Sequence, residues 1–188
     1  MIVVSDTTPL NYLILIEAAQ VLPALFGRVY APTAVIQELS DPRGPQPVRA
    51  WASSPPEWLA VEEPTQVDET LPKTLHKGEV EAISLARELG ADWVLIDERK
   101  ASREAESRGL RVAGTLGILE EGGARNLLDY EKGRDRLVKE TSFYVTDDVL
   151  RESERRYHER KQAQEQDQKT QELAVPTPED DERKEDGE

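Results

Sequence analysis

Apolar residues in this chain occur in short unbroken runs, and the segments between the runs have apolar residues at helical spacing. The N-terminal run is Ile2-Val3-Val4, and a second run of the same kind is Trp93-Val94-Leu95-Ile96. Such runs are typical of strands that are buried on both faces of a parallel sheet. The pattern predicts strands there, and three shorter strands at residues 28–31, 58–61 and 110–113.

Helical periodicity is clearest from Gly78 to Leu89, where Gly90 ends the pattern. The first predicted helix follows the N-terminal strand, with Thr8 as its N-cap and Pro9 at its first helical position. It covers residues 9–26 and is broken near residues 20–23. The other predicted helices cover residues 32–40, 46–52, 100–108, a segment near 118–119, 127–140 and 146–160.

Strands that alternate with helices in this way predict an α/β domain with a parallel sheet. The domain is expected to cover residues 1–160, and no internal repeat is visible. Residues 161–188 are rich in Gln, Glu, Asp, Lys and Pro and contain almost no apolar residue. Because such a segment cannot bury enough apolar surface to offset its ordering entropy, it is predicted to be a disordered tail or a frayed helix.

The formal net charge of −14 changes the range of partners that can be expected. Residues 161–188 hold ten acids and four bases, so a net charge of −8 remains in the rest of the chain. A chain of this charge is not a general polyanion binder, and a nucleic-acid substrate would need local Lys and Arg together with bound metal. No apolar run is long enough to span a membrane and no secretory signal is visible, so the protein is expected to be cytoplasmic.

Residue types narrow the chemistry further. The chain has no cysteine, which excludes disulfides, thiolate zinc sites and cysteine nucleophiles, and its two histidines, His76 and His158, are far apart. Any metal would therefore be held by oxygen atoms, as Mg²⁺ or Mn²⁺ prefers.

Four carboxylates are expected to point inward. Asp6 and Asp97 directly follow the two most apolar strands, at the end of a parallel sheet where α/β proteins build their sites. Glu38 lies one turn from Val35 on its helix. Glu79 shares a helical stripe with Ile83 and Ala86, whereas Glu81 and Glu88 are expected to face solvent.

Each of these acids also has a simpler interpretation. Asp97 could be the N-cap of the helix that follows it, and Asp6 could accept hydrogen bonds from the Thr7-Thr8 turn. A helical glutamate such as Glu38 or Glu79 is usually solvated. Four acids aimed at one place, however, repel one another unless a cation neutralises them. A Mg²⁺ or Mn²⁺ site explains the whole set.

Four segments of the chain, in this order and spacing, resemble the motifs of PIN domains. They are Val4-Ser5-Asp6-Thr7-Thr8-Pro9-Leu10, Pro32-Thr33-Ala34-Val35-Ile36-Gln37-Glu38-Leu39, Gly78-Glu79-Val80-Glu81-Ala82-Ile83-Ser84-Leu85-Ala86 and Val94-Leu95-Ile96-Asp97-Glu98. Gly114-Thr115-Leu116-Gly117 is similar to a feature of one PIN-like subgroup. The resemblance covers roughly residues 1–160 and implies a three-layer α/β/α fold with a parallel sheet in the order 3-2-1-4-5, which puts the first and fourth strands side by side.

The resemblance also implies an activity, because many PIN domains are small metal-dependent ribonucleases, among them the toxins of toxin–antitoxin pairs. Asp6, Glu38, Glu79 and Asp97 occupy the acidic positions of that family and are the expected catalytic residues and Mg²⁺ or Mn²⁺ ligands. Glu79 stands where the toxins more often have aspartate, and Glu98 is either a further member of the cluster or a helix cap. RNA is then the substrate, an antitoxin protein is the expected partner, and a homodimer is expected by analogy.

Other residues and other functions remain open from the sequence. Thr7 and Thr115 could contact the scissile phosphate or only cap helices, and Lys77, Arg99, Lys100 and Arg103 could hold the RNA backbone or simply be solvated. Haloacid-dehalogenase phosphatases need a second aspartate where this chain has Thr8, and receiver domains need an acidic pair and a lysine that are not evident. A catalytically inactive PIN-like module that acts through a protein partner is the alternative to the ribonuclease.

Overall fold

The centre of the computed structural model, which describes residues 1–174, is a parallel sheet of five short strands. The strand order is β3-β2-β1-β4-β5, which confirms the predicted order. In the register of the two central strands, Val3 lies beside Trp93 and Ser5 beside Leu95. The strands are β1 (Val3–Ser5), β2 (Val29–Ala31), β3 (Leu59–Val61), β4 (Trp93–Leu95) and β5 (Val112–Ala113).

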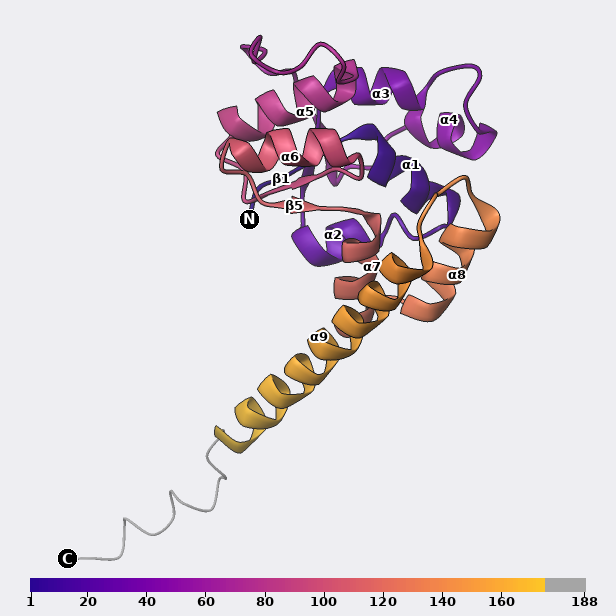
Figure 1. The fold of residues 1–188 in the computed structure, drawn as a ribbon, viewed down its shortest axis with the longest axis vertical. Coiled ribbons are helices and arrows are strands. Elements are labelled where there is room, and N and C mark those ends of the chain that lie inside the picture. The colour runs from indigo at the N-terminus through magenta and orange to yellow at the C-terminus, as the bar shows by residue number, and fades with distance from the viewer. Residues whose placement is uncertain (175–188) are drawn as a thin grey trace, which may run out of the picture.

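Helices cover both faces of this sheet and complete a three-layer α/β/α fold, as Figure 1 shows. On one face lie α1 (Thr7–Leu15), α2 (Val21–Phe26), α4 (Gln46–Ala52), α7 (Thr115–Ala124) and α8 (Tyr130–Glu140). On the other face lie α5 (Lys77–Glu88) and α6 (Arg99–Ser107). Helix α3 (Thr33–Leu39) packs against α1 and α4 and also against α5, so it links the two layers.

Alternation along the strands divides the core between the two faces. Val3 and Leu95 belong to the cluster under α1 and α7, whereas Val4 and Val94 belong to the cluster under α5 and α6. All four side chains are fully buried. This explains why the strands read as unbroken apolar runs, since a strand covered on both faces has no side for polar residues.

Helix α9 (Asp147–Ala174) packs along α7 at its N-terminal end and projects from the domain at its other end (Figure 1). Its anchor is an ion pair in which Arg156 donates to both carboxylate oxygens of the fully buried Glu120, at 3.0 and 2.7 Å. The residues 161–174, for which disorder was the first expectation, continue this helix. Gln, Glu and Lys are good helix formers, so an anchored helix can propagate through them. Residues 175–188, the rest of the tail for which disorder was predicted, lie outside the described residues.

Several element boundaries differ from those expected. Helix α1 begins at Thr7, so Asp6 occupies the N-cap position and the assignment of Thr8 as N-cap is wrong. Helix α8 begins at Tyr130 rather than at residue 127, because the Asp129 side chain accepts a hydrogen bond from the Lys132 amide at 3.0 Å. Among residues 1–174, no helix combines the length and the apolar composition needed to cross a bilayer.

Candidate active site

Asp6 lies immediately after β1, and its backbone amide donates to the Leu95 carbonyl of β4 at 2.9 Å. Its side chain is only 2% exposed, yet it makes no capping bond to α1. Within the described chain, Asp6 Oδ1 is a buried acceptor with no hydrogen-bond donor. The pKa of Asp6 is therefore raised to about 7, mainly by burial and also by the carboxylates of Glu79 and Glu38, while the backbone amide of Thr7 opposes the rise.

Glu38 connects three helices through its carboxylate. Oε2 accepts a hydrogen bond from the Thr7 hydroxyl of α1 at 2.5 Å, and Oε1 accepts one from the Gly78 amide of α5 at 2.8 Å. Glu38 lies in the last turn of α3, where the helix dipole disfavours a negative charge. The N-terminus of α5 offsets this, because its free amides point at the carboxylate. Glu38 therefore faces the interior and not bulk water.

Gly78 makes this approach of Glu38 sterically possible. A Cβ atom at position 78 would lie 2.8 Å from Glu38 Oε2 and 2.9 Å from the Thr7 hydroxyl oxygen. Both distances are shorter than a carbon and an oxygen tolerate without bonding. A glycine is therefore favoured at position 78, because a Cβ atom there would clash with the Glu38 carboxylate.

Replacing Gly78 with alanine is expected to lower the free energy of unfolding by about 1–3 kcal/mol, the usual cost of overpacking. The change would otherwise favour the helix, since alanine is better than glycine inside a helix by up to about 1 kcal/mol. The matched control is Gly117→Ala in α7, where a Cβ meets nothing within 4 Å. Denaturant unfolding of both variants checks this, and a stability gain at both positions would show that Gly78 is not confined.

Glu79 is the third carboxylate of the site, and like Asp6 it is buried, with 5% exposure. Its Oε2 accepts a hydrogen bond from the His76 amide at 2.7 Å, so the side chain also caps the start of α5. Burial raises the pKa of Glu79, the His76 amide lowers it, and the carboxylates of Glu98 and Glu38 raise it further. Its neighbour Glu81 was expected to face solvent, but its side chain is only 12% exposed and lies 3.4 Å from Lys77 Nζ.

Asp97 caps a different helix from the one considered from the sequence. Its oxygens accept hydrogen bonds from the Thr115 amide at 2.7 Å and from the Thr115 hydroxyl at 2.6 Å, at the start of α7. The cap of α6 is instead Glu98, whose side chain accepts from the Ala101 amide at 2.7 Å. Burial raises the pKa of Asp97, and the two bonds from Thr115 oppose that rise.

Gly114 leaves the space that the Asp97 carboxylate occupies. A Cβ atom at Gly114 would lie 2.8 Å from Asp97 Oδ1, the same distance as the corresponding contact at Gly78. Sequence reasoning placed Gly114 and Gly78 in motifs but assigned neither a role. The sequence feature that could have indicated this role is a glycine next to the start of a helix, because a side chain from another segment can then reach the free backbone amides there.

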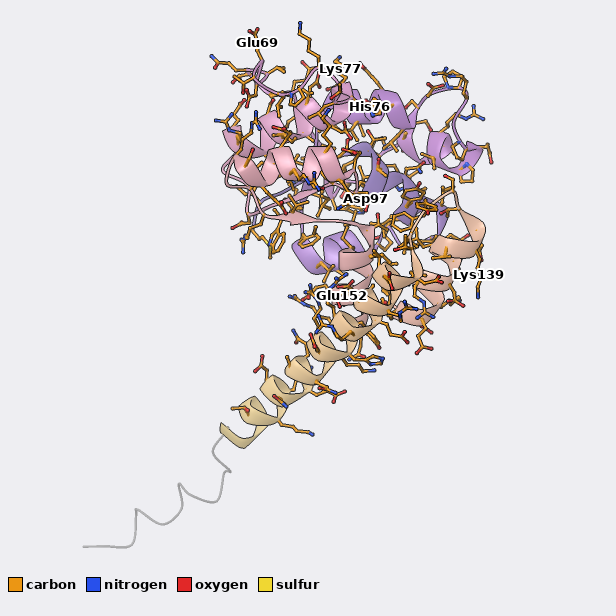
Figure 2. The ribbon with its side chains drawn as sticks, in the orientation of Figure 1. Glu69, His76, Lys77, Asp97, Lys139 and Glu152 are labelled. Carbon is orange, nitrogen blue, oxygen red and sulfur yellow. The ribbon has the colours of Figure 1, made fainter. Side chains whose placement is uncertain are left out.

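The three carboxylates of Asp6, Glu38 and Glu79 are therefore close enough to repel one another, with Glu98 beside Glu79 and Asp97 after the neighbouring strand. Figure 2 shows Asp97 inside the domain, and His76 and Lys77 at the start of α5. Across residues 1–174, no three or more acidic or histidine side chains are spaced to hold a metal ion as they stand. The four metal ligands thus stay a prediction.

The donor set itself fits a hard divalent cation. Asp6 offers a buried oxygen for which residues 1–174 supply no donor, and two further carboxylates raise its pKa by repulsion. A bound cation would satisfy that oxygen and reverse the repulsion. The oxygens of Glu38, Glu79 and Asp97 that already accept hydrogen bonds keep further lone pairs, because each carboxylate has about four.

The fold and the site together define a class of protein: an α/β/α domain with an aspartate at the carboxyl end of each of its two central strands, of which Asp6 is buried. A family model described as a PIN domain matches residues 2–159, and the chain belongs to that family. The PIN fold is a nuclease-type fold. No curated protein is similar enough to count as a match.

Proposed function

We propose that this protein is a metal-dependent ribonuclease that hydrolyses RNA phosphodiester bonds. The observation that carries the proposal is the buried Asp6 carboxylate, whose Oδ1 has no donor among the described residues and which lies beside Glu38 and Glu79. Asp6, Glu38 and Glu79 would hold Mg²⁺ or Mn²⁺, with Asp97 completing the site. The ion supplies a bound water of lowered pKa and stabilises charge on the phosphate oxygens.

The residues around the acids would orient the reacting groups. Thr7 and the Gly78 amide fix the Glu38 carboxylate, and Thr115 fixes that of Asp97. Glu79 is suited to accept a proton from water, because burial raises its pKa and makes the carboxylate a stronger base. The positive N-termini of α1, α5 and α7 face the acids, and helix N-termini also favour an incoming phosphate.

Dependence on a divalent ion is the first test. The purified protein is expected to cleave single-stranded RNA with Mn²⁺ or Mg²⁺ and to lose cleavage completely in excess chelator, because the acids alone repel a phosphate. Adding Mn²⁺ back should restore the rate, as measured by gel analysis of a labelled oligonucleotide. Cleavage that persists in chelator at an unchanged rate is incompatible with the proposal.

The biological setting is a further part of the proposal. This PIN ribonuclease would act in the cytoplasm as the toxin of a toxin–antitoxin pair, with an antitoxin protein as its partner and a homodimer as its assembly. Expression in a bacterial host should then arrest growth, and Asp6→Asn should relieve the arrest. Growth arrest by both the wild type and Asp6→Asn would show that the toxicity does not depend on RNA cleavage.

A second candidate is a PIN-like module that binds a protein partner and does not catalyse. It is favoured by one observation: Glu38, Glu79 and Asp97 already accept hydrogen bonds from protein donors. Titration calorimetry with Mn²⁺ separates the two candidates. Binding that Asp6→Asn weakens supports the ribonuclease, and the absence of any binding supports the module.

A further inference from the structure

Basic side chains gather beside the acidic centre, at the start of α5 and along the first turns of α6. We call Lys73, Lys77, Arg99, Lys100 and Arg103 the basic rim, and all five are exposed. A hydrogen bond from Lys100 Nζ to the Thr74 hydroxyl joins α6 to the loop before α5, so the two segments lie side by side. The rim borders the candidate site, because Lys77 directly precedes Gly78, whose amide donates to Glu38 at 2.8 Å, and Arg99 follows Asp97 by two residues.

The rim residues are short of partners in a chain with an excess of acids. Within the described residues, Arg99, Arg103 and Lys73 make no ion pair, Lys100 contacts a neutral hydroxyl, and Lys77 lies 3.4 Å from Glu81. Arginines elsewhere are mostly paired. Arg108 donates to Asp68 at 2.9 Å, and Arg156 holds Glu120. Positive charge is thus left unneutralised at this place.

Local stability does not explain these positions. Arg99 and Lys100 are the first two residues of α6, and Lys77 is the first residue of α5. The helix dipole is positive at an N-terminus and disfavours cations there. Helices α5, α8 and α9 carry acids in their first turns, as the ordinary rule expects, whereas the first turn of α6 carries none. A residue choice that breaks a local rule without a structural gain is typical of a functional surface.

We propose that the basic rim binds the phosphate backbone of single-stranded RNA and leads it to the acidic centre. This inference rests on the proposed ribonuclease function and names the surface that holds the substrate. The large apolar side chains that are exposed in the described part, such as Tyr144, lie outside the rim, so the rim offers mainly cations, with the exposed imidazole of His76 beside Lys77. Binding is therefore expected to be salt-dependent and tolerant of sequence.

The experiment measures RNA affinity apart from cleavage. In an Asp6→Asn background, the variant Arg99→Ala/Lys100→Ala/Arg103→Ala is titrated with a fluorescent single-stranded RNA over a range of salt. The Kd is expected to rise about 10- to 100-fold, and the slope of log Kd against log salt to fall by about 2, since each lost contact with a single strand removes about 0.7. The control is Arg28→Ala/Lys132→Ala/Lys169→Ala, which removes three exposed bases elsewhere and should leave the Kd unchanged.

The outcomes keep this inference separate from the function on which it rests. A selective loss of affinity in the rim variant supports the rim even if the wild-type protein never cleaves RNA. An unchanged Kd and slope overturn the rim, while metal-dependent cleavage by the wild type would still support the ribonuclease. Equal displacement of RNA by a poly-glutamate peptide and by a second RNA would also overturn the assignment, because the surface would then be a general site for acidic chains.

Discussion

Replacing Asp6 with asparagine is expected to lower the rate of RNA cleavage by at least about 100-fold, more than the loss usually seen when only an outer partner of a metal ligand is removed. Asparagine would keep the size of the side chain at this position but not its charge. The buried oxygen of Asp6 is the one that lacks a donor within the described chain, so a cation has most to gain there. Single-turnover cleavage in saturating Mn²⁺ measures the effect.

Two comparisons make the result specific to Asp6. Asp167→Asn removes an exposed acid from α9 and should leave the rate unchanged. Glu38→Gln should also slow cleavage, although its carboxylate already accepts bonds from Thr7 and Gly78. Circular dichroism should show the same fold in all three variants. A rate for Asp6→Asn within a few-fold of the wild type would remove Asp6 from the catalytic centre.

Much of the fold could be predicted from the sequence because local pattern and tertiary environment agree. The run Ile2-Val3-Val4 is apolar throughout, and strand β1, which begins one residue later at Val3 and ends at Ser5, is covered on both faces. The helix at residues 46–52 was predicted at its observed bounds, and Pro45 supplies the extended residue before it. The inward position of Glu79 also followed from helical spacing alone, since its stripe is the buried one.

The details of the site could not be predicted, because they depend on contacts between distant segments. Asp97 accepts bonds from Thr115, 18 residues later, and Glu38 accepts one from Gly78, 40 residues later. Its position in the sequence suggested that Asp97 caps the helix that follows it, α6, but the side chain of Glu98 caps that helix. No spacing rule states which helix N-terminus a carboxylate will meet. Only the assembled sheet order brings these pairs together.

The C-terminal helix shows a different limit. The composition of residues 161–174 indicates a segment that cannot form a core, and this is correct, since residues 161–170 are largely exposed. Composition does not say whether such a segment is helical. Here the preceding turns of α9 are fixed on α7 by the Arg156–Glu120 ion pair and on α8 by the Tyr130–Ser153 hydroxyl pair, at 2.9 Å. The costly nucleation step is thereby complete, and propagation needs only residues of good helix propensity.

The stability of the metal-free protein is expected to fall as pH rises from about 4 to about 7, and Asp6→Asn should remove the share of that fall that Asp6 causes. Glu79 and Asp97, whose pKa values burial also raises, keep their share in the variant. The pKa of Asp6 is 3.8 in the unfolded chain and about 7 in the folded protein, mainly because of burial. Between these values the folded state binds the proton more tightly, so stability is full below the lower pKa and is lost through the higher one. The loss attributable to Asp6 is up to about 4 kcal/mol, from 1.36 kcal/mol for each pH unit between the two values.

Thermal unfolding across this pH range, in chelator, checks the effect for both proteins. The wild type should lose stability relative to Asp6→Asn as pH rises, and at about pH 8 the variant should be the more stable of the two. Added Mn²⁺ should then stabilise the wild type, by about 2.7 kcal/mol at a hundred times the Kd, and leave the variant nearly unchanged. The gain should shrink in acid, where a proton occupies the same oxygens. Parallel pH profiles for the two proteins would mean that Asp6 is solvated or already neutralised, and neither condition suits a buried metal ligand.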